Sequence, residues 1–330
     1  MRRAEPEGRR ALVVGAGVAG LCAATALQER GIATTLIERT TGLGEDSASW
    51  IAGGMIAPWC EGESAPAQVT ARGETALDWW DARVPGVSRT GTLAVAPPRD
   101  GAEVSRFAAR TSRRARLGGE EIAALEPELA GRFRDGLFFA DEGHLDPRAA
   151  LRALLARFEA QGGVARFGAD RADGSGFGAI VDCRGLAARD ALPELRAVRG
   201  EAFVLRAPDV RLTRCVRFLH PRIPLYVVPR GGGLYMVGAT MVESEDSGGV
   251  TARSAVELLA AAYALHPGFA EAEIVEMRAG LRPAFDDNAP RIVARGGRLH
   301  VNGLYRHGFL LAPALAMEVA DAVTRAEAAE

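Results

Sequence analysis

The chain opens on a short apolar run, a stretch with a helical pattern and a second apolar run. Residues 11–14 are uniformly apolar, residues 18–30 follow a helical pattern, and residues 32–37 form a second, largely apolar run that ends on Glu38. Short apolar runs bounded by turn residues are typical of strands buried on both faces. The opening therefore predicts a strand–helix–strand unit.

Two later segments return the chain to the same kind of layer. Asp146 followed by Pro147 predicts the N-cap and first position of a helix that runs to about residue 160. Strands are expected at residues 163–168 and 179–183, and a closing helix from residue 309 onward.

Between these segments the pattern changes to longer strands. Arg230 and the three glycines that follow it predict a hairpin turn. Thr251 predicts the N-cap of a helix that runs to about residue 265. Strands are expected at 91–96, 137–140, 202–206, 211–219, 224–229, 234–240, 272–280 and 299–301, and helical segments at 70–83 and 103–129 with a break at Gly118 and Gly119.

The order of these elements predicts an α/β protein with a Rossmann-type layer. We expect this layer to consist of residues 1–60, 137–195 and 275–330. Residues 61–136 and 196–274 are expected to form an inserted, mostly antiparallel β-sheet domain that binds the substrate. A chain of 330 residues is long enough for two such domains.

The turn after the first strand has the spacing G-x-G-x-x-G at Gly15, Gly17 and Gly20. Gly15 permits a tight turn, Gly17 lets the backbone approach a pyrophosphate, and Gly20 lets helix and strand pack closely. The helix N-terminus supplies free N–H groups, and Glu38 stands where a carboxylate can accept hydrogen bonds from ribose hydroxyls. A secretory signal would lack this spacing and the second strand, so the motif predicts a dinucleotide site.

Composition excludes several classes of function. All 40 basic residues are arginine, so Schiff-base and Walker-type lysine chemistry is excluded. The formal net charge of −2 gives no field that favours nucleic acid or an anionic membrane. The four cysteines form no C-x-x-C pair and the five histidines have no ligand spacing, so we expect no metal, no disulfide and a cytoplasmic protein.

Small residues are concentrated at residues 47–58, in the segment SASWIAGGMIAP. Two interpretations stay open for it. Small side chains permit the backbone to approach a bulky ligand closely. Alternatively, Ser47 or Ser49 caps a short helix that only packs against the rest of the protein.

On these residues the chain resembles the D-amino acid oxidase family of flavoproteins, and within it the glycine oxidases of thiamin biosynthesis. The resemblance covers most of the chain. It rests on VVGAGVAGL at 13–21, ASWIAGGMIAPWCE at 48–61, VDCRGLAARD at 181–190, YVVPRGGGLYMVGATM at 226–241, GLRPAFDDNAPRI at 280–292 and NGLYRHGFLLAPALA at 302–316. The first motif is shared by many nucleotide-dependent enzymes, but its combination with the last two is specific.

The resemblance implies FAD, bound without a covalent link in a GR2-like domain. The loop at 304–310 would run past the flavin ring, where its N–H groups and the closing helix could stabilise negative charge on the reduced ring. Val164 would contact the adenine through its backbone. The implied cofactor lining is Gly15, Gly17, Val18, Ala19, Gly20, Glu38, Arg39, Ala48, Ser49, Gly53, Gly54, Met55, Val164, Leu304, Tyr305, Arg306, His307, Gly308, Phe309 and Leu310.

The resemblance also implies a substrate end. Arg282 matches the arginine that pairs with the substrate carboxylate, Tyr226 a tyrosine that donates to it, and Arg306 a second arginine near the site. Met241 and Ala57 match the pocket wall, although core packing explains either residue nearly as well. Taken without the resemblance, an arginine in a chain with 40 of them is more simply a solvated surface charge.

The implied reaction is oxidation of a small amino acid, with glycine first and sarcosine, D-alanine or D-proline next. A hydride would pass from Cα to flavin N5, and molecular oxygen would reoxidise the flavin to give hydrogen peroxide. The imino acid would hydrolyse to a 2-oxo acid and ammonia, or supply iminoglycine for the thiazole of thiamin. His307 is a candidate general base, but the family reaction needs none from a side chain.

Two rival functions stay open. One is a dehydrogenase of the same fold that passes electrons to a quinone or a protein acceptor. The other is a non-catalytic FAD-binding protein. The oligomeric state, including a homo-oligomer, also stays open.

Overall fold

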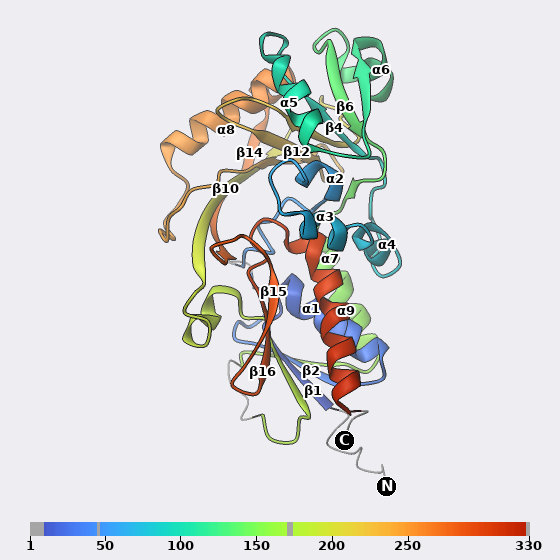
Figure 1. The fold of residues 1–330 in the computed structure, drawn as a ribbon. Coiled ribbons are helices and arrows are strands. Elements are labelled where there is room, and N and C mark those ends of the chain that lie inside the picture. The colour runs from blue at the N-terminus through green and yellow to red at the C-terminus, as the bar shows by residue number, and fades with distance from the viewer. Residues whose placement is uncertain (1–9, 45–46, 170–173, 328–330) are drawn as a thin grey trace.

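Two large sheets form the two halves of the molecule (Figure 1). The computed structural model describes residues 10–44, 47–169 and 174–327. One half is built on a six-stranded sheet and the other on an eight-stranded sheet, and helices cover both. This arrangement confirms the α/β class with a Rossmann-type layer and a second domain.

The six-stranded sheet contains the opening strand–helix–strand unit. Its strands, in order across the sheet, are β15 (Arg291–Arg295), β16 (Arg298–Asn302), β9 (Ala179–Asp182), β1 (Arg10–Val14), β2 (Ala33–Glu38) and β8 (Val164–Phe167). All of them pair in parallel except β15 with β16, which form an antiparallel hairpin. Every residue of β1 after Arg10 is buried, which explains its uniformly apolar sequence.

Three helices pack together against this sheet: α1 (Val18–Glu29), α7 (Pro147–Ala160) and α9 (Gly308–Glu327). Helix α1 lies between the other two and can approach β1 closely because of Gly20, where a Cβ would lie 1.8 Å from the carbonyl oxygen of Gly15. The predicted cap of α7 is confirmed, since Asp146 accepts hydrogen bonds from the N–H groups of Arg148 and Ala149.

The eight-stranded sheet is antiparallel apart from the parallel pair of β4 and β11. Its strands in order are β14 (Glu273–Ala284), β10 (Arg196–Arg206), β13 (Leu234–Gly238), β12 (Leu225–Pro229), β11 (Cys215–Phe218), β4 (Thr92–Val95), β6 (Asp135–Phe139) and β5 (Ala115–Gly118). The predicted hairpin of β12 and β13 is confirmed. So is the cap of α8 (Ala252–Leu265), where Thr251 accepts a hydrogen bond from the Ser254 N–H at 3.3 Å.

The remaining elements are short. A two-stranded sheet pairs β3 (Met55–Ile56) with β7 (Gly143–His144). The other helices are α2 (Pro58–Glu61), α3 (Ala67–Gly73), α4 (Ala76–Asp81), α5 (Ala102–Arg110) and α6 (Gly119–Leu125), and the 3₁₀ turns are η2 (Pro98–Asp100), η3 (Pro127–Leu129), η4 (Gly185–Asp190) and η5 (Pro267–Glu271).

The sequence prediction differs from the structure in several elements; for example, the helix expected at 70–83 is divided into α3 and α4. The helical segment at 103–129 contains strand β5, whose mostly exposed residues lie at the edge of the large sheet and give no apolar pattern. Strands β6 and β14 belong to the eight-stranded sheet, although most of their residues fall in the ranges expected for the Rossmann-type layer. The domain boundaries themselves stay a prediction.

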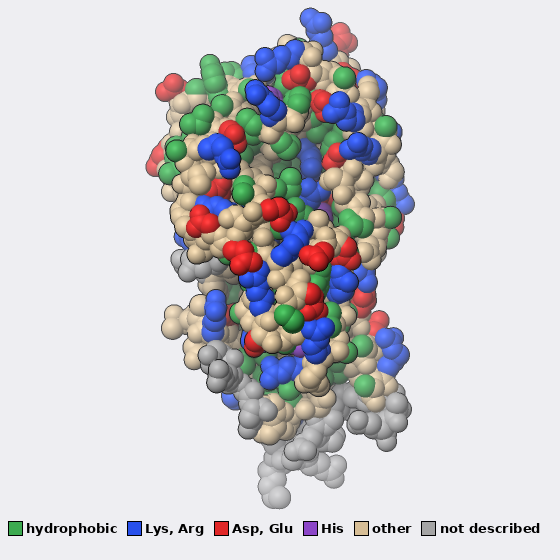
Figure 2. Space-filling model, turned by 60° about the vertical axis from the view of Figure 1, so that its left-hand side comes forward, with side chains coloured by type: hydrophobic (Ala, Val, Ile, Leu, Met, Phe, Trp, Pro, Cys, Tyr) green, Lys and Arg blue, Asp and Glu red, His purple; other side chains and the backbone are tan. Residues whose placement is uncertain are grey.

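Figure 2 shows arginine side chains interspersed with acidic ones over one face of the molecule. This mixture agrees with the small net charge. Within the described ranges no helix is both long enough and apolar enough to cross a membrane.

Candidate active site

Residues from both sheets line a cavity of about 1930 Å³. It exceeds the roughly 300–1,000 Å³ of an ordinary ligand pocket, which leaves room for a dinucleotide and a small substrate. Its lining includes these residues of the predicted cofactor site: Gly15, Gly17, Val18, Ala19, Glu38, Arg39, Ala48, Ser49, Gly53, Gly54, Met55, Leu304, Tyr305, Arg306, His307, Gly308, Phe309 and Leu310. It also includes these residues of the predicted substrate site: Ala57, Tyr226, Met241 and Arg282.

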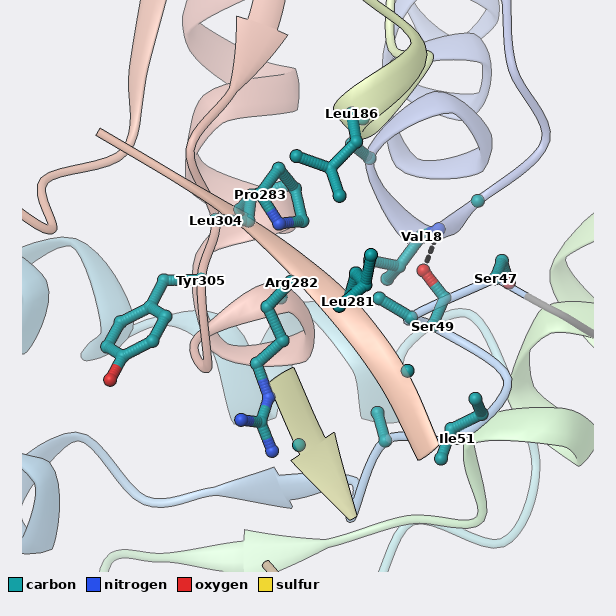
Figure 3. A pocket seen from close by; sticks show the side chains of 18 of the residues that line it. Val18, Ser47, Ser49, Ile51, Leu186, Leu281, Arg282, Pro283, Leu304 and Tyr305 are labelled. Atoms are coloured by element: carbon teal, nitrogen blue, oxygen red, sulfur yellow. Dashed lines mark hydrogen bonds between the residues drawn. The ribbon is translucent and has the colours of Figure 1, made fainter. Parts of the chain in front are cut away.

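The glycine turn before α1 forms one end of the cavity. Gly15 has a φ of 102°, and a Cβ there would lie 2.7 Å from the carbonyl oxygen of Cys183, so only glycine fits. Gly17 is the N-cap of α1, and Ser49 accepts a hydrogen bond from the Val18 N–H at 3.0 Å (Figure 3). Gly17, Val18 and Ala19 line the cavity, so the helix N-terminus faces it and suits a phosphate.

Glu38 stands at the end of β2, beside the same turn. Its Oε2 accepts a hydrogen bond from the Ala16 N–H at 2.7 Å, and its Oε1 accepts one from the Thr40 N–H at 3.2 Å. A carboxylate oxygen has two acceptor positions, so each oxygen keeps one for a further donor. The role of Glu38 toward a ribose stays a prediction.

Two predicted cofactor residues lie outside the cavity lining. Gly20 acts in packing, as described above. Val164 is 45% exposed at the start of β8, whereas ligands of parallel sheets bind at the carboxyl ends of the strands. Ala169, just past that end of β8, lines the cavity, and its N–H donates to the Glu38 carbonyl at 2.9 Å. Ala169, and not Val164, thus lines the cavity at this end of β8, and contact of either residue with an adenine stays a prediction.

The small residues at 47–58 form turns and β3, so the helix interpretation of this segment is wrong up to Pro58, where α2 begins. A Cβ at Gly53 would lie 2.8 Å from the ring of Tyr226. Gly54 has a φ of 79°, and a Cβ there would lie 2.1 Å from the carbonyl oxygen of Leu145. The small side chains let the loop pass between neighbours on the wall of the cavity.

Two arginines donate hydrogen bonds to carbonyl groups of the segment at 47–58. Arg230 Nη2 donates to the Ala52 carbonyl at 2.8 Å, and Arg148 Nε donates to the Trp50 carbonyl at 3.1 Å. The loop carries Gly53, Gly54 and Met55 in the cavity wall and is therefore fixed before any ligand binds.

Arg282 extends from β14 into the cavity (Figure 3). Its Nη1 donates to the Thr240 carbonyl at 3.1 Å. On the neighbouring strand β10, a Cβ at Gly200 would lie 2.2 Å from Nη2, so the guanidinium crosses directly over this glycine. Among the described residues no carboxylate lies within 4.0 Å of Arg282. Its charge is thus available to an anionic ligand.

Tyr226 reaches the same part of the cavity from β12. Its ring packs against Gly53. Burial raises the pKa of Tyr226 above its ordinary value, and the nearby Arg282 only partly opposes this effect. The hydroxyl therefore stays protonated and can donate a hydrogen bond.

Arg306 has a partner that the sequence did not predict. Its Nη2 lies 2.9 Å from Glu61 Oε2 and donates to Ser64 Oγ at 2.6 Å. The other oxygen of Glu61 accepts a hydrogen bond from Arg217 Nη1 at 2.7 Å. The only available signal for Glu61 was its place at the end of the motif at 48–61, and Arg217 gave none.

His307 is buried beside this group, with Nδ1 3.5 Å from Glu61 Oε2. Burial lowers its pKa to about 4, and Arg306 and Arg217 act in the same direction, while Glu61 opposes them. His307 is therefore neutral at physiological pH. Its role as a general base stays untested.

The loop from Leu304 to the start of α9 closes the cavity on the other side. Tyr305 has a φ of 49° and donates its N–H to the Pro283 carbonyl at 2.8 Å, which ties the loop to the end of β14. The Tyr305 hydroxyl lies 3.4 Å from the sulfur of Met241. Met241 is 48% exposed and Ala57 is buried, and both line the cavity.

This arrangement fits FAD. A glycine turn, a helix N-terminus and an acidic residue at the end of β2 line the cavity, and so do residues 53–55 and 304–310. Added Cβ atoms at Gly15, Gly53 and Gly54 would collide with neighbours, so the backbone can form the cavity wall there only with glycine. Four free cysteines are buried, and within the described residues no group of three or more His, Cys, Asp or Glu could hold a metal.

The fold and this site define a class, the dinucleotide-dependent oxidoreductases in which a second sheet contributes an arginine to the cavity beside the glycine turn. Comparison with known proteins specifies the family. The model of the DAO family, described as FAD dependent oxidoreductase, matches residues 10–322. The chain belongs to this family, which confirms the predicted cofactor.

Individual relatives agree with this assignment. A Rhizobium etli protein named "Putative thiamine biosynthesis oxidoreductase ThiO" is 54% identical over 312 residues, which are 94% of this chain and 95% of that protein. The glycine oxidase of Pseudomonas aeruginosa is 30% identical over 358 residues, 96% of this chain and 95% of the relative. The chain is an FAD-dependent enzyme of the amino acid oxidase class.

The crystal structure of glycine oxidase from Geobacillus kaustophilus has the same fold, with a TM-score of 0.79. It covers 96% of this chain and 95% of its own, at 24% identity. At this identity the likeness supports the architecture alone.

Proposed function

We propose that the protein oxidises a small amino acid, with glycine as its first substrate, to the imino acid. The observation that carries the proposal is the position of Arg282. Its guanidinium enters the cavity without a carboxylate partner among the described residues. A partly buried charge of this kind is stabilised by an anionic ligand, and a planar guanidinium matches a carboxylate. The names of the two relatives, glycine oxidase and thiamine biosynthesis oxidoreductase, support the choice of substrate.

The residues of this chain act by binding and orienting. Arg282 binds both oxygens of the α-carboxylate, and the Tyr226 hydroxyl donates a further hydrogen bond. Because Arg282 is fixed by the Thr240 carbonyl and by its contact with Gly200, the bound carboxylate also fixes the position of Cα. Bound FAD supplies the acceptor for the two electrons and the hydrogen that leave Cα.

The substrate amine must be neutral when the hydrogen leaves Cα. Positive charge near the site favours the neutral amine, and Arg282, which has no carboxylate partner among the described residues, supplies it. His307 is already neutral, with a pKa of about 4, so it does not add a further charge. In this proposal no side chain has to act as a base.

We further propose that molecular oxygen accepts the electrons, giving hydrogen peroxide. The imino acid then hydrolyses to a 2-oxo acid and ammonia or enters thiazole formation for thiamin. The name of the Rhizobium etli relative supports the thiamin link. A quinone or protein acceptor is the alternative that the test below distinguishes.

The test is anaerobic mixing of the holoenzyme with glycine, sarcosine, D-alanine and D-proline, followed by oxygen and peroxide assay. We expect glycine to bleach the flavin and to give one peroxide per glycine. Arg282→Met should lower kcat/KM for glycine by about 1,000-fold, since it removes a bidentate charged pair. Bleaching by large D-amino acids alone would overturn glycine as substrate. Bleaching without peroxide would identify a dehydrogenase, and no bleaching by any amino acid would favour a non-catalytic protein.

A further inference from the structure

Two arginines of the cavity lie against the same two-residue segment. Arg282 Nη1 donates to the Thr240 carbonyl at 3.1 Å, and Arg306 Nη1 lies 3.5 Å from the sulfur of Met241, the next residue. Both guanidinium groups therefore border the substrate end of the cavity. Among the described residues, only Arg306 of the two has a carboxylate partner, Glu61.

Glu61 stands between two guanidinium groups. Arg217 Nη1 donates a hydrogen bond to Glu61 Oε1 at 2.7 Å, and Arg306 Nη2 lies 2.9 Å from Glu61 Oε2. The side chain of Glu61 is 13% exposed, and all three residues line the cavity. Burial opposes ionisation, but Arg306 and Arg217 outweigh it and hold the pKa of Glu61 well below its usual range. Glu61 thus carries a full negative charge at the cavity wall.

We propose that Glu61 is a specificity-determining residue that limits the site to amino acids with a single carboxylate. The inference rests on the proposed function, because it assumes that Arg282 binds the α-carboxylate. A second carboxylate, as in D-aspartate or iminodiacetate, needs a second guanidinium. The one beside Met241 is already paired with Glu61. The incoming group would also face the charge of Glu61, and like charges repel strongly in a partly buried site.

Removing the charge of Glu61 should reverse this preference. In Glu61→Gln the repelling carboxylate is gone and Arg306 has lost its anionic partner. A guanidinium next to an open cavity readily pairs with a carboxylate by two parallel hydrogen bonds. Arg282 does not contact Glu61 in the structure, so binding of the α-carboxylate is retained.

The experiment measures binding of two unreactive probes to the holoenzyme. Acetate has one carboxylate and succinate has two, and both are titrated by the change in the flavin spectrum. The wild type should bind succinate no more tightly than acetate. In Glu61→Gln the ratio of succinate to acetate affinity should rise at least ten-fold, and D-aspartate should begin to bleach the flavin. If Glu61 has a purely structural role, the variant should bind both probes more weakly, and the ratio of succinate to acetate affinity should stay unchanged.

A second variant covers the case in which Glu61→Gln does not fold, since it leaves two partly buried arginines without their carboxylate partner. Glu61→Gln/Arg217→Met removes one charge of each sign and so keeps the net charge of the group. It should show the same gain for succinate, because Arg306 is again released. Glu61→Gln/Arg306→Met is the matched control and should show no gain.

The outcomes separate the two proposals. An unchanged succinate-to-acetate ratio in folded, FAD-loaded variants overturns the role of Glu61 while glycine oxidation stands. A gain that persists without Arg306 also overturns it. If glycine fails to bleach the wild-type flavin although the ratio of succinate to acetate affinity shifts as expected, the proposed substrate is wrong. The role of Glu61 in excluding a second carboxylate then still stands.

Discussion

The guanidinium of Arg282 lies directly over the backbone of Gly200, so that an added Cβ would be 2.2 Å from Nη2 and 2.3 Å from Cζ. The two residues are on adjacent strands, where Gly200 pairs with Gly280, two positions before Arg282. Glycine at this position thus gives the long side chain a path along the sheet into the cavity. The position of the candidate anion site thus depends on a residue that has no side chain of its own.

Gly200→Ala should displace Arg282 and leave the cofactor end intact. The contact is too close for a Cβ, so the guanidinium has to move by an ångström or more. Misplacement on this scale costs about 100-fold in catalysis. We expect kcat/KM for glycine to fall by about that factor, measured by flavin bleaching, with an unchanged flavin spectrum.

Gly249→Ala is the matched control for this prediction. Gly249 also lines the cavity, but an added Cβ would meet no atom within 4 Å. Its kcat/KM should stay within about two-fold of the wild type, within the range of surface substitutions. Equal losses in both variants would show that Gly200 has no special relation to Arg282.

Tyr226→Phe should remove one donor to the substrate carboxylate. A hydrogen bond to a charged group contributes about 1.5–3 kcal/mol, so carboxylate affinity should fall by roughly ten-fold or more. The ring still packs on Gly53, and the loop at 53–55 should keep its place. We expect acetate affinity and kcat/KM to fall together, measured by flavin titration and steady-state kinetics. Unchanged acetate binding would place the hydroxyl outside the anion site.

Local signals in the sequence predict much of the fold. The glycine turn, the cap at Asp146 and the cap at Thr251 each act within a few residues, and the structure has all three. Sheet membership depends on pairing between distant residues. Strand β14 pairs with β10, and nothing in its own sequence distinguishes that sheet from the Rossmann-type layer.

The candidate site divides in the same way. Arg282 and Tyr226 stand in motifs that resemble a known family, so their place in the cavity could be predicted. Glu61 and Arg217 are 156 residues apart, and only the folded chain brings their side chains within 2.7 Å. Val164 lies at the start of β8 and outside the cavity lining, whereas Ala169, just past the carboxyl end of that strand, lines the cavity, and the sequence pattern alone did not distinguish the two ends.

Glu38→Ala should weaken FAD binding. The carboxylate holds the Ala16 N–H at 2.7 Å and so orders the glycine turn. Loss of a charged hydrogen bond, together with any ribose contact, should raise the dissociation constant of FAD by about ten-fold or more. The measurement is reconstitution of the apoprotein followed by flavin fluorescence. Glu38→Gln keeps an acceptor for the Ala16 N–H, so its FAD affinity should lie between those of the wild type and Glu38→Ala. Equal FAD affinity in all three proteins would exclude a role for this carboxylate.

Glu142→Gln should change how stability depends on pH. Glu142 is fully buried, accepts a hydrogen bond from the Cys60 N–H at 2.7 Å, and has a pKa that burial raises to about 8 from the model-peptide value of 4.5. Between these pH values the folded state binds a proton that the unfolded state has lost, so stability falls as pH rises. The total loss is roughly 5 kcal/mol at 1.36 kcal/mol per pH unit.

Glutamine is neutral at every pH and avoids this loss. The difference in free energy of unfolding between variant and wild type should therefore grow in favour of the variant from pH 5 to pH 8, measured by denaturant titration. His307 and His144, whose pKa values burial lowers to about 4, give the opposite slope between pH 4 and 6.5, but they are present in both proteins and cancel in the difference. Glu120→Gln, at an exposed position in α6, should show a difference that does not vary with pH. A constant difference for Glu142→Gln as well would mean that Glu142 is ionised in the folded protein.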